Sequence, residues 1–444
     1  MWFKPSFKLP AVAAISFCLI SGTVPAVADT LLVPSEFATI QAAIDAAKDG
    51  DLILVAPGTY GEAINLLGKA IELRSELGSA VTVIDGKSLG SSVITCVSGE
   101  SADTVIDGFT IRGGTGTFLD PPFAGFSGGG MLNIDSSPTV QNCLFIDNST
   151  TMRGGGICNI ASSPIVSMCV FDGNTALSRG GAIYNAGANG TDSNPLFNEC
   201  TFGNNDTAGI GGAMFNTGVD GNVGNPILIG CTLVGNHAAN RGGAVYANGG
   251  NAEYVNCFFD SNVSGVHGGG IYNLGASPIV TDCLFLNNHA VGNGGGIINT
   301  NFSETMIIGT RFRSNTSGMN GAAVANGAVA SIVIDTCTFE LNTAQGVGGG
   351  VFGSGQSTIR DSSFCENVPD HINGNWVDDG GNSFFAFCCL GDLNRDNIVG
   401  VSDLLILLGF WGPCEKVCLG DFDNSGAVGV KDLLILLGNW GQCP

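Results

Sequence analysis

Positively charged residues are scarce in this sequence, which has 16 Lys and Arg against 38 Asp and Glu in 444 residues and a formal net charge of −22. A chain this acidic is a poor partner for nucleic acid, because phosphate binding needs clustered Lys and Arg. Charge of either sign is low, at 12% of residues, so we expect a surface made largely of Asn, Ser, Thr and Gly. The composition therefore argues against a nucleic acid partner and fits a protein that is soluble outside the cell.

Long apolar runs are missing beyond the N-terminus. Lys4 and Lys8 precede an apolar run over 9–20 and the small-residue stretch 26–28, a pattern typical of a secretory signal peptide. We expect cleavage before Asp29, so that residues 1–28 are removed and the loss of two lysines takes the charge from −22 to −24. No later run reaches the roughly 18 apolar residues of a membrane span. The mature chain is therefore expected to lack a transmembrane segment and to be secreted or held at the cell surface.

A repeat of 25 to 31 residues fills the sequence from about Gly128 to Asn367. Each copy opens with Gly-Gly-Gly/Ala, nearly always reaches an Asn, and closes on Cys-x-Phe-x-x-Asn or a near variant. The first Asn is residue 133, 159, 185, 216, 248, 273, 299 or 326, and the closing Asn is residue 148, 174, 205, 236, 262, 288, 315, 342 or 367. The copies contain short β-type runs without helical periodicity, so one copy can form one coil of a parallel β-helix. We expect the first Asn, the closing Asn, the Phe and the Cys of successive copies each to stack in a ladder along the axis, with buried amides bonding from coil to coil.

Two resemblances agree with this interpretation. The tetrapeptides Gly180–Ile183 and Phe202–Asn205 resemble the repeats of the polymorphic outer-membrane protein family, which implies a surface-exposed β-helical adhesin. Residues 35–60, with a short helix that Gly50 can end and a strand at 52–56, resemble the N-terminal cap and first coil of pectin-lyase-like right-handed β-helices. We therefore predict an all-β right-handed parallel β-helix over 29–388. Its expected parts are a cap and first coil at 29–60, the repeats at 128–367 and a C-terminal cap at 368–388.

Two features of the repeats are candidate binding sites. The spacing from the first Asn to the Cys grows to 15 residues in two adjacent copies, so the segments 187–194 and 218–225 should project side by side. Insertions on one face of a solenoid often mark its binding face, although two tolerated loops are the simpler interpretation. The residue before Gly-Gly is basic in several copies, and such a stripe could hold an anionic sugar or phosphate or could pair with nearby acids. The candidate ligand-binding residues are Asp192, Asn194, Asp220, Asn225, Arg153, Arg179 and Arg241.

Fifteen of the 16 cysteines lie beyond the signal peptide. Seven occupy the ladder position, where parallel side chains give poor disulfide geometry and buried free thiols are favoured. These seven are Cys143, Cys169, Cys200, Cys231, Cys257, Cys283 and Cys337. Cys365 and Cys388 could close the C-terminal cap, and the pairs Cys389–Cys414 and Cys418–Cys443 are each expected to clasp one unit of the duplicated C-terminal region.

Residues 389–444 contain a 12-residue loop and an apolar segment, LLILLG, twice at an offset of 29. Oxygen side chains at loop positions 1, 3, 5 and 12, with a backbone carbonyl at position 7, are the ligands that Ca²⁺ requires. The expected ligands are Asp392, Asn394, Asp396, Ile398 and Asp403 in the first loop, and Asp421, Asp423, Ser425, Ala427 and Asp432 in the second. The duplication resembles a type I dockerin, which implies calcium binding and a cohesin-like or cell-surface scaffold partner. Gly400 and Gly429 replace the usual ligand at position 9, and Ser425 is a weaker ligand than Asp.

The sequence of the repeats shows no cluster of catalytic residues. Pectin-active hydrolases need paired carboxylates, and lyases need a calcium-binding Asp beside a basic residue. The acidic residues of the repeats are scattered singly, and no Ser-His-Asp arrangement stands out. We therefore expect an exported, non-catalytic surface or scaffold-associated protein that binds glycans or other cell-surface partners. The alternative is an extracellular polysaccharide lyase or hydrolase, because dockerins usually accompany catalytic modules and the N-terminal coils resemble pectin-active enzymes.

Overall fold

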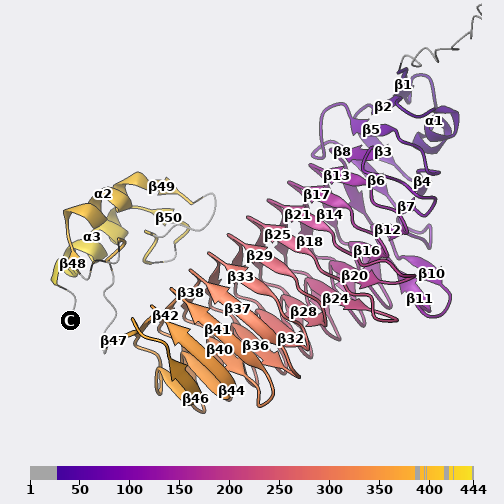
Figure 1. Ribbon diagram of the computed structural model, residues 1–444. Coiled ribbons are helices and arrows are strands. Elements are labelled where there is room, and N and C mark those ends of the chain that lie inside the picture. The colour runs from indigo at the N-terminus through magenta and orange to yellow at the C-terminus, as the bar shows by residue number, and fades with distance from the viewer. Residues whose placement is uncertain are drawn as a thin grey trace, which may run out of the picture.

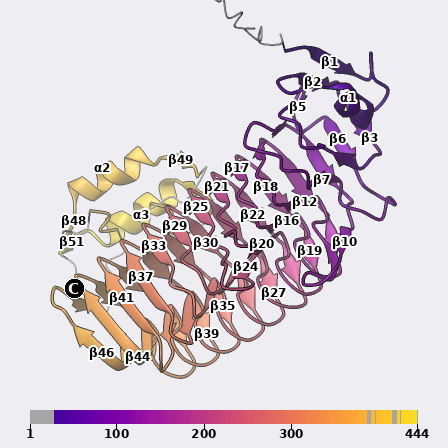
Figure 2. The ribbon, with the colours of Figure 1, turned by 45° about the vertical axis from the view of Figure 1, so that its right-hand side comes forward.

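The repeats wind into a parallel β-solenoid whose coils stack along one axis (Figures 1 and 2). The structure is a computed structural model and describes residues 28–385, 391–394, 396, 398–414, 420–423 and 425–442. Of the expected signal peptide, only Ala28 is among these residues. Cys388, Cys389, Cys418 and Cys443 also lie outside them. Among the described residues, no helix is both long and apolar enough to cross a membrane.

Four rows of parallel strands make up the solenoid, and a typical repeat contributes one strand to each row. Row 1 consists of β4 (Ile64–Asn65), β7 (Ile94–Cys96), β12 (Met131–Ile134), β16 (Ile157–Ile160), β20 (Ile183–Gly187), β24 (Met214–Gly218), β28 (Val245–Asn248), β32 (Ile271–Leu274), β36 (Ile297–Thr300) and β40 (Val324–Asn326). Row 2 consists of β1 (Thr30–Val33), β2 (Leu52–Val55), β5 (Glu72–Ser75), β8 (Val105–Asp107), β13 (Thr139–Gln141), β17 (Ile165–Ser167), β21 (Leu196–Asn198), β25 (Ile227–Ile229), β29 (Glu253–Val255), β33 (Ile279–Thr281), β37 (Glu304–Ile308) and β41 (Ser331–Asp335). The long strand β44 (Val351–Arg360) continues both rows, and β46 (Ile372–Asp378) pairs with it.

The other two rows complete each coil. Row 3 consists of β3 (Gly58–Tyr60), β6 (Thr82–Asp85), β9 (Thr110–Arg112), β14 (Leu144–Ile146), β18 (Val170–Asp172), β22 (Thr201–Gly203), β26 (Thr232–Val234), β30 (Phe258–Asp260), β34 (Leu284–Leu286), β38 (Arg311–Arg313), β42 (Thr338–Glu340), β45 (Ser363–Cys365) and β47 (Ser383–Phe385). Row 4 consists of β15 (Ser149–Thr150), β19 (Thr175–Ala176), β23 (Asp206–Thr207), β27 (His237–Ala238), β31 (Val263–Ser264), β35 (His289–Ala290), β39 (Thr316–Ser317) and β43 (Thr343–Ala344). The strand register thus confirms the predicted parallel β-solenoid.

The Gly-Gly pair at the start of each repeat is required by the backbone. Gly180 has φ +63°, a left-handed conformation that favours glycine. Gly181 lies so close to the next coil that an added Cβ would collide with the carbonyl oxygen of Gly212. The first glycine therefore makes the turn, and the second lets two neighbouring backbones approach each other.

The closing asparagines form a continuous buried ladder, as predicted. Asn262 is fully buried, and its Nδ2 donates to Asn288 Oδ1 and to the carbonyl oxygen of Leu233, both at 2.9 Å. Its Oδ1 accepts from the backbone N and the Nδ2 of Asn236. Each amide in such a row satisfies groups on both neighbouring coils, so a polar side chain can occupy the core. The equivalent bonds run from Asn148 to Asn367.

The predicted phenylalanine stack lies beside this ladder. Phe285 and Phe312 stack with ring centroids 4.9 Å apart, and Phe339 and Phe364 with centroids 4.6 Å apart. The stack continues onto Phe384 at 5.2 Å, so the region expected to cap the solenoid adds one more coil through β46 and β47. Leu233 replaces one ring and divides the stack into two parts. Six of the ladder cysteines, from Cys143 to Cys283, are buried free thiols, and Cys337 is buried in the same column.

The prediction that Asn248 belongs to the first Asn row is wrong. Asn216 lies in register with Ala247, and Ala247 in turn with Asn273. Asn248 is one position further along β28 and is exposed. The sequence GGAVYAN places one residue more between the glycines and the Asn than GGGIYN does, so counting from Gly242 puts Ala247 in the row.

The N-terminal edge is covered by α1 (Ile40–Ala46), which begins at the N-cap Thr39. The Thr39 side chain accepts from the backbone N–H of Ala42, and Ile40, Ala43 and Ile44 pack into the core. The helix ends at Ala46, before Gly50, which instead makes the following turn with φ +90°. A helix at this edge covers strand groups that would otherwise be open to other chains.

A small unit with two short helices follows the solenoid and is coloured yellow in Figure 1. It contains β48 (Ile398–Val399), α2 (Val401–Gly409), β49 (Gly412–Pro413), β50 (Ala427–Val428), α3 (Val430–Gly438) and β51 (Gly441–Gln442). The antiparallel pairs β48–β51 and β49–β50 each join one half of the duplication to the other. Val399, Leu407, Val428 and Leu436 form its small core. Cys388 and Cys389, the partners expected for Cys365 and Cys414, lie outside the described residues.

Candidate functional site

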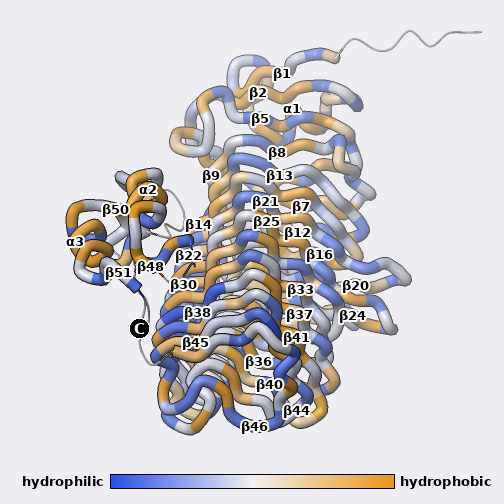
Figure 3. Tube along the Cα trace, turned by 60° about the vertical axis from the view of Figure 1, so that its left-hand side comes forward, coloured by the Kyte–Doolittle hydropathy of each residue, from blue (hydrophilic) through white to orange (hydrophobic). Residues whose placement is uncertain are grey.

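The two inserted loops, Gly187–Asn194 and Gly218–Asn225, lie on adjacent coils, as the sequence predicts. Both turn at a pair with positive φ: Asn189-Gly190 in one loop and Asp220-Gly221 in the other, the residue types that tight hairpin turns prefer. Ser193 bridges to Gly224, which aligns the loops. Figure 3 shows them projecting from the solenoid beside β20 and β24.

The four polar residues predicted in these loops have two different roles. Asp192 accepts a 2.9 Å hydrogen bond from the backbone N of Val223, so it ties one loop to the other. Asn225 Oδ1 accepts from the backbone N of Asn251 on the next coil. Asn194 and Asp220 are exposed. Asn194 and Asp220 are therefore the side chains of this set that offer polar atoms to solvent.

A second apolar core, which we call the outer core, covers the outside of row 1. Four of its rings, those of Tyr184, Phe215, Tyr246 and Tyr272, stack at successive centroid distances of 5.5, 5.2 and 4.9 Å. None of the four is more than 5% exposed. Ala188 from the first inserted loop and Val219 from the second pack against this core, so the loops have an apolar base.

The arginines of the predicted basic stripe cover the faces of these rings. Backbone bridges align Arg153, Arg179 and Ile210, and a further bridge aligns Arg241 with His267. Each guanidinium carbon lies over the ring in the next coil, at 5.5 Å for Arg153 over Tyr184, 5.5 Å for Arg179 over Phe215 and 5.4 Å for Arg241 over Tyr272. A cation over an aromatic face is stabilised by the ring quadrupole. The arginines therefore make cation–π contacts with the rings of the outer core.

Burial also changes the ionisation of this region. Burial raises the pKa of the Tyr184 phenol to about 12, against the lowering effect of the Arg153 and Arg179 charges. Burial likewise raises the pKa of the Cys158 thiol to about 12. The pKa of His267 is lowered, first by burial and then by the charge of Arg241. Burial therefore favours the uncharged forms of Tyr184, Cys158 and His267.

A hairpin that the sequence reasoning missed projects beside the outer core. Strands β10 (Thr117–Leu119) and β11 (Gly125–Ser127) pair antiparallel, with Phe118 opposite Phe126. The two rings are 5.4 Å apart at 74°, and they are 59% and 38% exposed. Phe123 and Leu119 point the other way, into the outer core. The signal was present as Phe-Leu-Asp-Pro-Pro-Phe over 118–123, in which Pro-Pro marks a turn between β-type residues.

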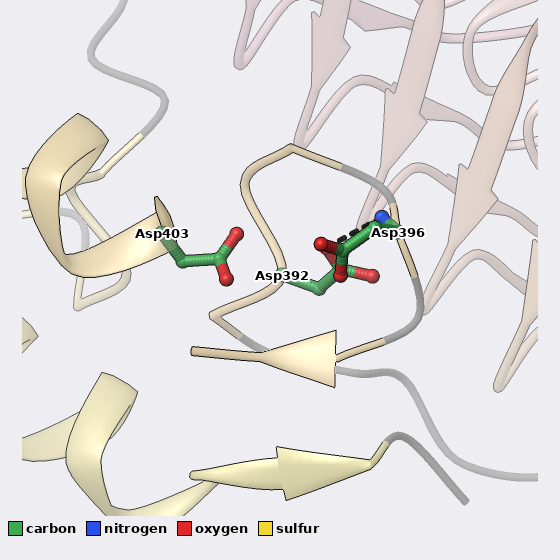
Figure 4. Close-up of side chains that lie close together, drawn as sticks. All are labelled: Asp392, Asp396 and Asp403. Carbon is green, nitrogen blue, oxygen red and sulfur yellow. Dashed lines mark hydrogen bonds between the residues drawn. The ribbon is translucent and has the colours of Figure 1, made fainter. Parts of the chain in front are cut away.

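Two acidic triads gather in the C-terminal unit. Ligand atoms of Asp392, Asp396 and Asp403 all lie within 4.8 Å of one another, and so do those of Asp421, Asp423 and Asp432. Figure 4 shows Asp392 and Asp396 on one side of the first loop with Asp403 entering from α2, and the Asp396 backbone N donates to Asp392 Oδ1. The triads bring together six of the ten predicted metal ligands.

The position-12 aspartates organise both loops. Asp403 is buried; its Oδ1 accepts from the backbone N of Leu393 and of Asn394, and its Oδ2 accepts from Gly400. Asp432 is equally buried and accepts from Phe422 and Gly429 in the same way. These hydrogen bonds hold each loop around its carboxylates. Hard oxygen donors in a loop of this length fit Ca²⁺.

Each helix of the C-terminal unit also exposes an apolar face. On α2 this face is formed by Val401 at 64%, Leu405 at 64% and Leu408 at 47% exposure. The face of α3 is formed by Val430, Leu434 and Leu437, with exposures of 65%, 62% and 47%. Trp411 and Trp440 follow the helices and are about equally exposed. The duplication thus produces two similar apolar surfaces.

The strand register and ladders described above define the class of this protein as a parallel β-solenoid with a small helical C-terminal unit. Residues 168–186 match the Chlamydia polymorphic membrane protein repeat. None of the curated proteins compared with the chain matches it.

Two phage proteins of known structure are similar to this chain. Tailspike protein 3 of bacteriophage CBA120 has 10% identity and a TM-score of 0.42, covering 80% of this chain and 60% of its own. This chain therefore spans less than two thirds of that tailspike. The tailspike receptor binding domain of siphovirus 9NA has 11% identity and a TM-score of 0.28, with 81% and 76% covered. Because both similarities are remote, the class of fold rests on the strand register of the chain itself.

Proposed function

We propose that this chain is an exported surface or scaffold-associated binding protein whose solenoid presents a glycan-binding face and whose C-terminal unit docks when it binds calcium. The observation that carries the proposal is the duplicated C-terminal arrangement, in which each acidic triad lies at the start of a helix with an exposed apolar face. Calcium would be held by the oxygens of Asp392, Asn394, Asp396 and the carbonyl of Ile398 with Asp403, and by the equivalent residues of the second loop. The cation supplies charge that offsets the three carboxylates of each loop.

The apolar helix faces support a docking role. A contiguous exposed patch of large apolar residues on a small unit is typical of a surface that a partner covers. Val401 and Val430, at loop position 10, are among the most exposed of these residues. The resemblance to dockerins makes a cohesin-like domain or a cell-surface scaffold the expected partner. Two similar faces allow the unit to dock in either of two orientations.

The solenoid supports the binding role through its loops. Gly187–Asn194 and Gly218–Asn225 are anchored from below by the outer core and present Asn194 and Asp220 to solvent. Amide and carboxylate oxygens on a rigid base are suited to hydrogen bonds with sugar hydroxyls. The similarity of residues 168–186 to a surface-protein repeat agrees with this location.

The binding role is tested by trimming both loops to the ten-residue spacing of the other copies and measuring retention on a panel of insoluble polysaccharides. Loop shortening costs little conformational entropy, so thermal stability should change little while retention is lost. Asn194→Ala with Asp220→Ala should weaken retention, and the exposed pair Asn142→Ala with Asp147→Ala is the matched control. Full retention by the trimmed protein would contradict the proposal. Release of soluble sugars by the wild-type protein would instead make it a polysaccharide-degrading enzyme.

A further inference from the structure

The hairpin β10–β11 presents two large apolar rings to solvent from a rigid base. Single exposed aromatic residues are common, but Phe118 and Phe126 are paired in register on a projecting hairpin. Their edge-to-face contact at 5.4 Å fixes the angle between the rings. The pair therefore offers a shaped apolar surface rather than two independent side chains.

The base of the hairpin is held by Arg153, one of the residues predicted to bind an anion. Arg153 is 6% exposed, and its Nη1 donates to the carbonyl oxygens of Phe123 at 2.9 Å and Ala124 at 3.2 Å. Its guanidinium lies between the rings of Phe123 and Tyr184, 5.9 and 5.5 Å from their centroids. This arginine joins the hairpin to the outer core and is buried away from an external anion. It is a positioning residue for the hairpin.

The hairpin and the inserted loops belong to one face of the solenoid. Phe123 from the hairpin, Ala188 from the first loop and Val219 from the second contact the same outer core. Asn189 donates from Nδ2 to Asp135 Oδ2 at 3.5 Å. Asp135 directly follows β12, the row 1 strand that comes after the hairpin, so the first loop reaches back toward the coil that bears the hairpin. A ligand on the loops can therefore extend to the two rings.

We propose that Phe118 and Phe126 form an aromatic platform for the sugar rings of an uncharged polysaccharide, with Asn194 and Asp220 binding its hydroxyl groups. This inference rests on the proposed binding function and names its ligand class. A pyranose ring presents C–H bonds on one face, which pack against aromatic faces and edges, and hydroxyl groups around its rim. The aromatic platform can pack against the C–H face of the sugar, and the polar loops can bind its hydroxyl groups.

The charge of the chain favours an uncharged polysaccharide over an anionic polysaccharide or an anionic lipid surface. The chain carries a formal net charge of −22, which repels anionic polysaccharides and anionic lipid headgroups. Asp120, at the tip of the hairpin, is exposed and adds negative charge beside the rings. Arg179 and Arg241, which could offset this charge, lie over Phe215 and Tyr272. An uncharged glycan avoids this repulsion.

The test uses the full-length protein with cellulose, chitin and a β-1,3-glucan as uncharged probes, and with polygalacturonate and phosphatidylserine vesicles as anionic probes. Phe118→Ala with Phe126→Ala should weaken binding to at least one uncharged glycan by about tenfold. Phe118→Trp with Phe126→Trp should retain binding, because the platform keeps its aromatic faces. Phe302→Ala removes a ring that is 71% exposed, six coils along row 1 from the hairpin, and should change nothing.

The outcomes separate the two proposals. Wild-type binding by the Phe118→Ala/Phe126→Ala protein, with binding lost on loop trimming, would overturn the platform and leave the binding function intact. Platform-dependent binding to vesicles instead of glycans would also overturn it, in favour of a lipid ligand. An unchanged melting temperature in the double variant establishes that the loss of binding is not a loss of folding. Retention of none of the glycans by the wild-type protein would overturn both proposals.

Discussion

Asn216 lies in register with Ala247, and this pairing interrupts a row of buried amides in the core. Asn133, Asn159, Asn185 and Asn216 are joined by Nδ2–Oδ1 bonds of 2.8 Å, and the row resumes from Asn273 to Asn299. At the gap, Asn216 Nδ2 and Asn273 Oδ1 are buried without a hydrogen-bond partner. Each such group costs free energy when it is removed from water.

We expect Ala247→Asn to raise the free energy of unfolding by about 1 kcal/mol, because one amide would satisfy both groups. The coil of Asn185 combines its Asn with the fully buried ring of Phe197, in the column where the coil of Ala247 holds Tyr254, whose buried hydroxyl also has no hydrogen-bond partner. Urea unfolding followed by circular dichroism measures the change. Ala247→Asp has the same size but no donor for Asn273, so it should destabilise. Equal stabilities of the wild-type and Ala247→Asn proteins would contradict the claim that the unpaired amide groups at this gap reduce stability.

The continuous ladder predicts the opposite effect for Asn262→Leu. The substitution removes the acceptor of the Asn236 backbone N and Nδ2 and the donor to Leu233. We expect the free energy of unfolding to fall by at least about 2 kcal/mol. The control is Asn251→Leu in the same coil, where the side chain is exposed and the change should be small. Similar melting temperatures of these two variants would show that the buried amide bonds contribute little.

The sequence predicted the solenoid and its core because the repeat places Asn, Phe and Cys at fixed positions. One Asn per coil predicts a ladder when every copy bears it, and Asn148 to Asn367 do so without a gap. Asn248 was misplaced because proximity in sequence was used where the count from Gly242 decides the register. A single residue moves a side chain to the opposite face of a strand.

The roles of the basic stripe could not be read in the same way. A sequence shows that Arg153, Arg179 and Arg241 recur at one position, but not that their side chains extend over rings in the next coil. Each contact joins an Arg of one repeat to a row 1 ring of the next repeat, so it depends on how the coils stack. The hairpin β10–β11 was missed because it interrupts no repeat and occurs once.

Alkaline pH should unfold this protein through its buried acids. Burial raises the pKa of Tyr184 in the folded chain from 10.0 to about 12, so the phenol stabilises the fold fully below pH 10.0, and this stability is lost as the pH rises toward about 12. The two-unit difference corresponds to roughly 2–3 kcal/mol. Tyr184→Phe should reduce the fall in melting temperature over this range, and the stacked Phe215 shows that Phe suits the row. Parallel pH profiles for the two proteins would contradict this assignment.

Calcium should stabilise the C-terminal unit, with the first loop binding more tightly than the second. Before the metal binds, three carboxylates crowd each loop, and the cation removes this repulsion, so that binding energy becomes folding energy. In the second loop Ser425 is a weaker ligand than Asp396, and Lys431 Nζ lies 3.5 Å from Asp423 where the first loop has Ser402. Calorimetry on the full chain should show two sites, of which Asp392→Ala removes the tighter and Asp421→Ala the weaker. The fluorescence of Trp411 and Trp440, which follow the two helices, should report a higher melting temperature in calcium than in chelator. Identical melting curves in both conditions, with no heat of calcium binding, would rule out calcium-dependent folding and remove the main support for docking.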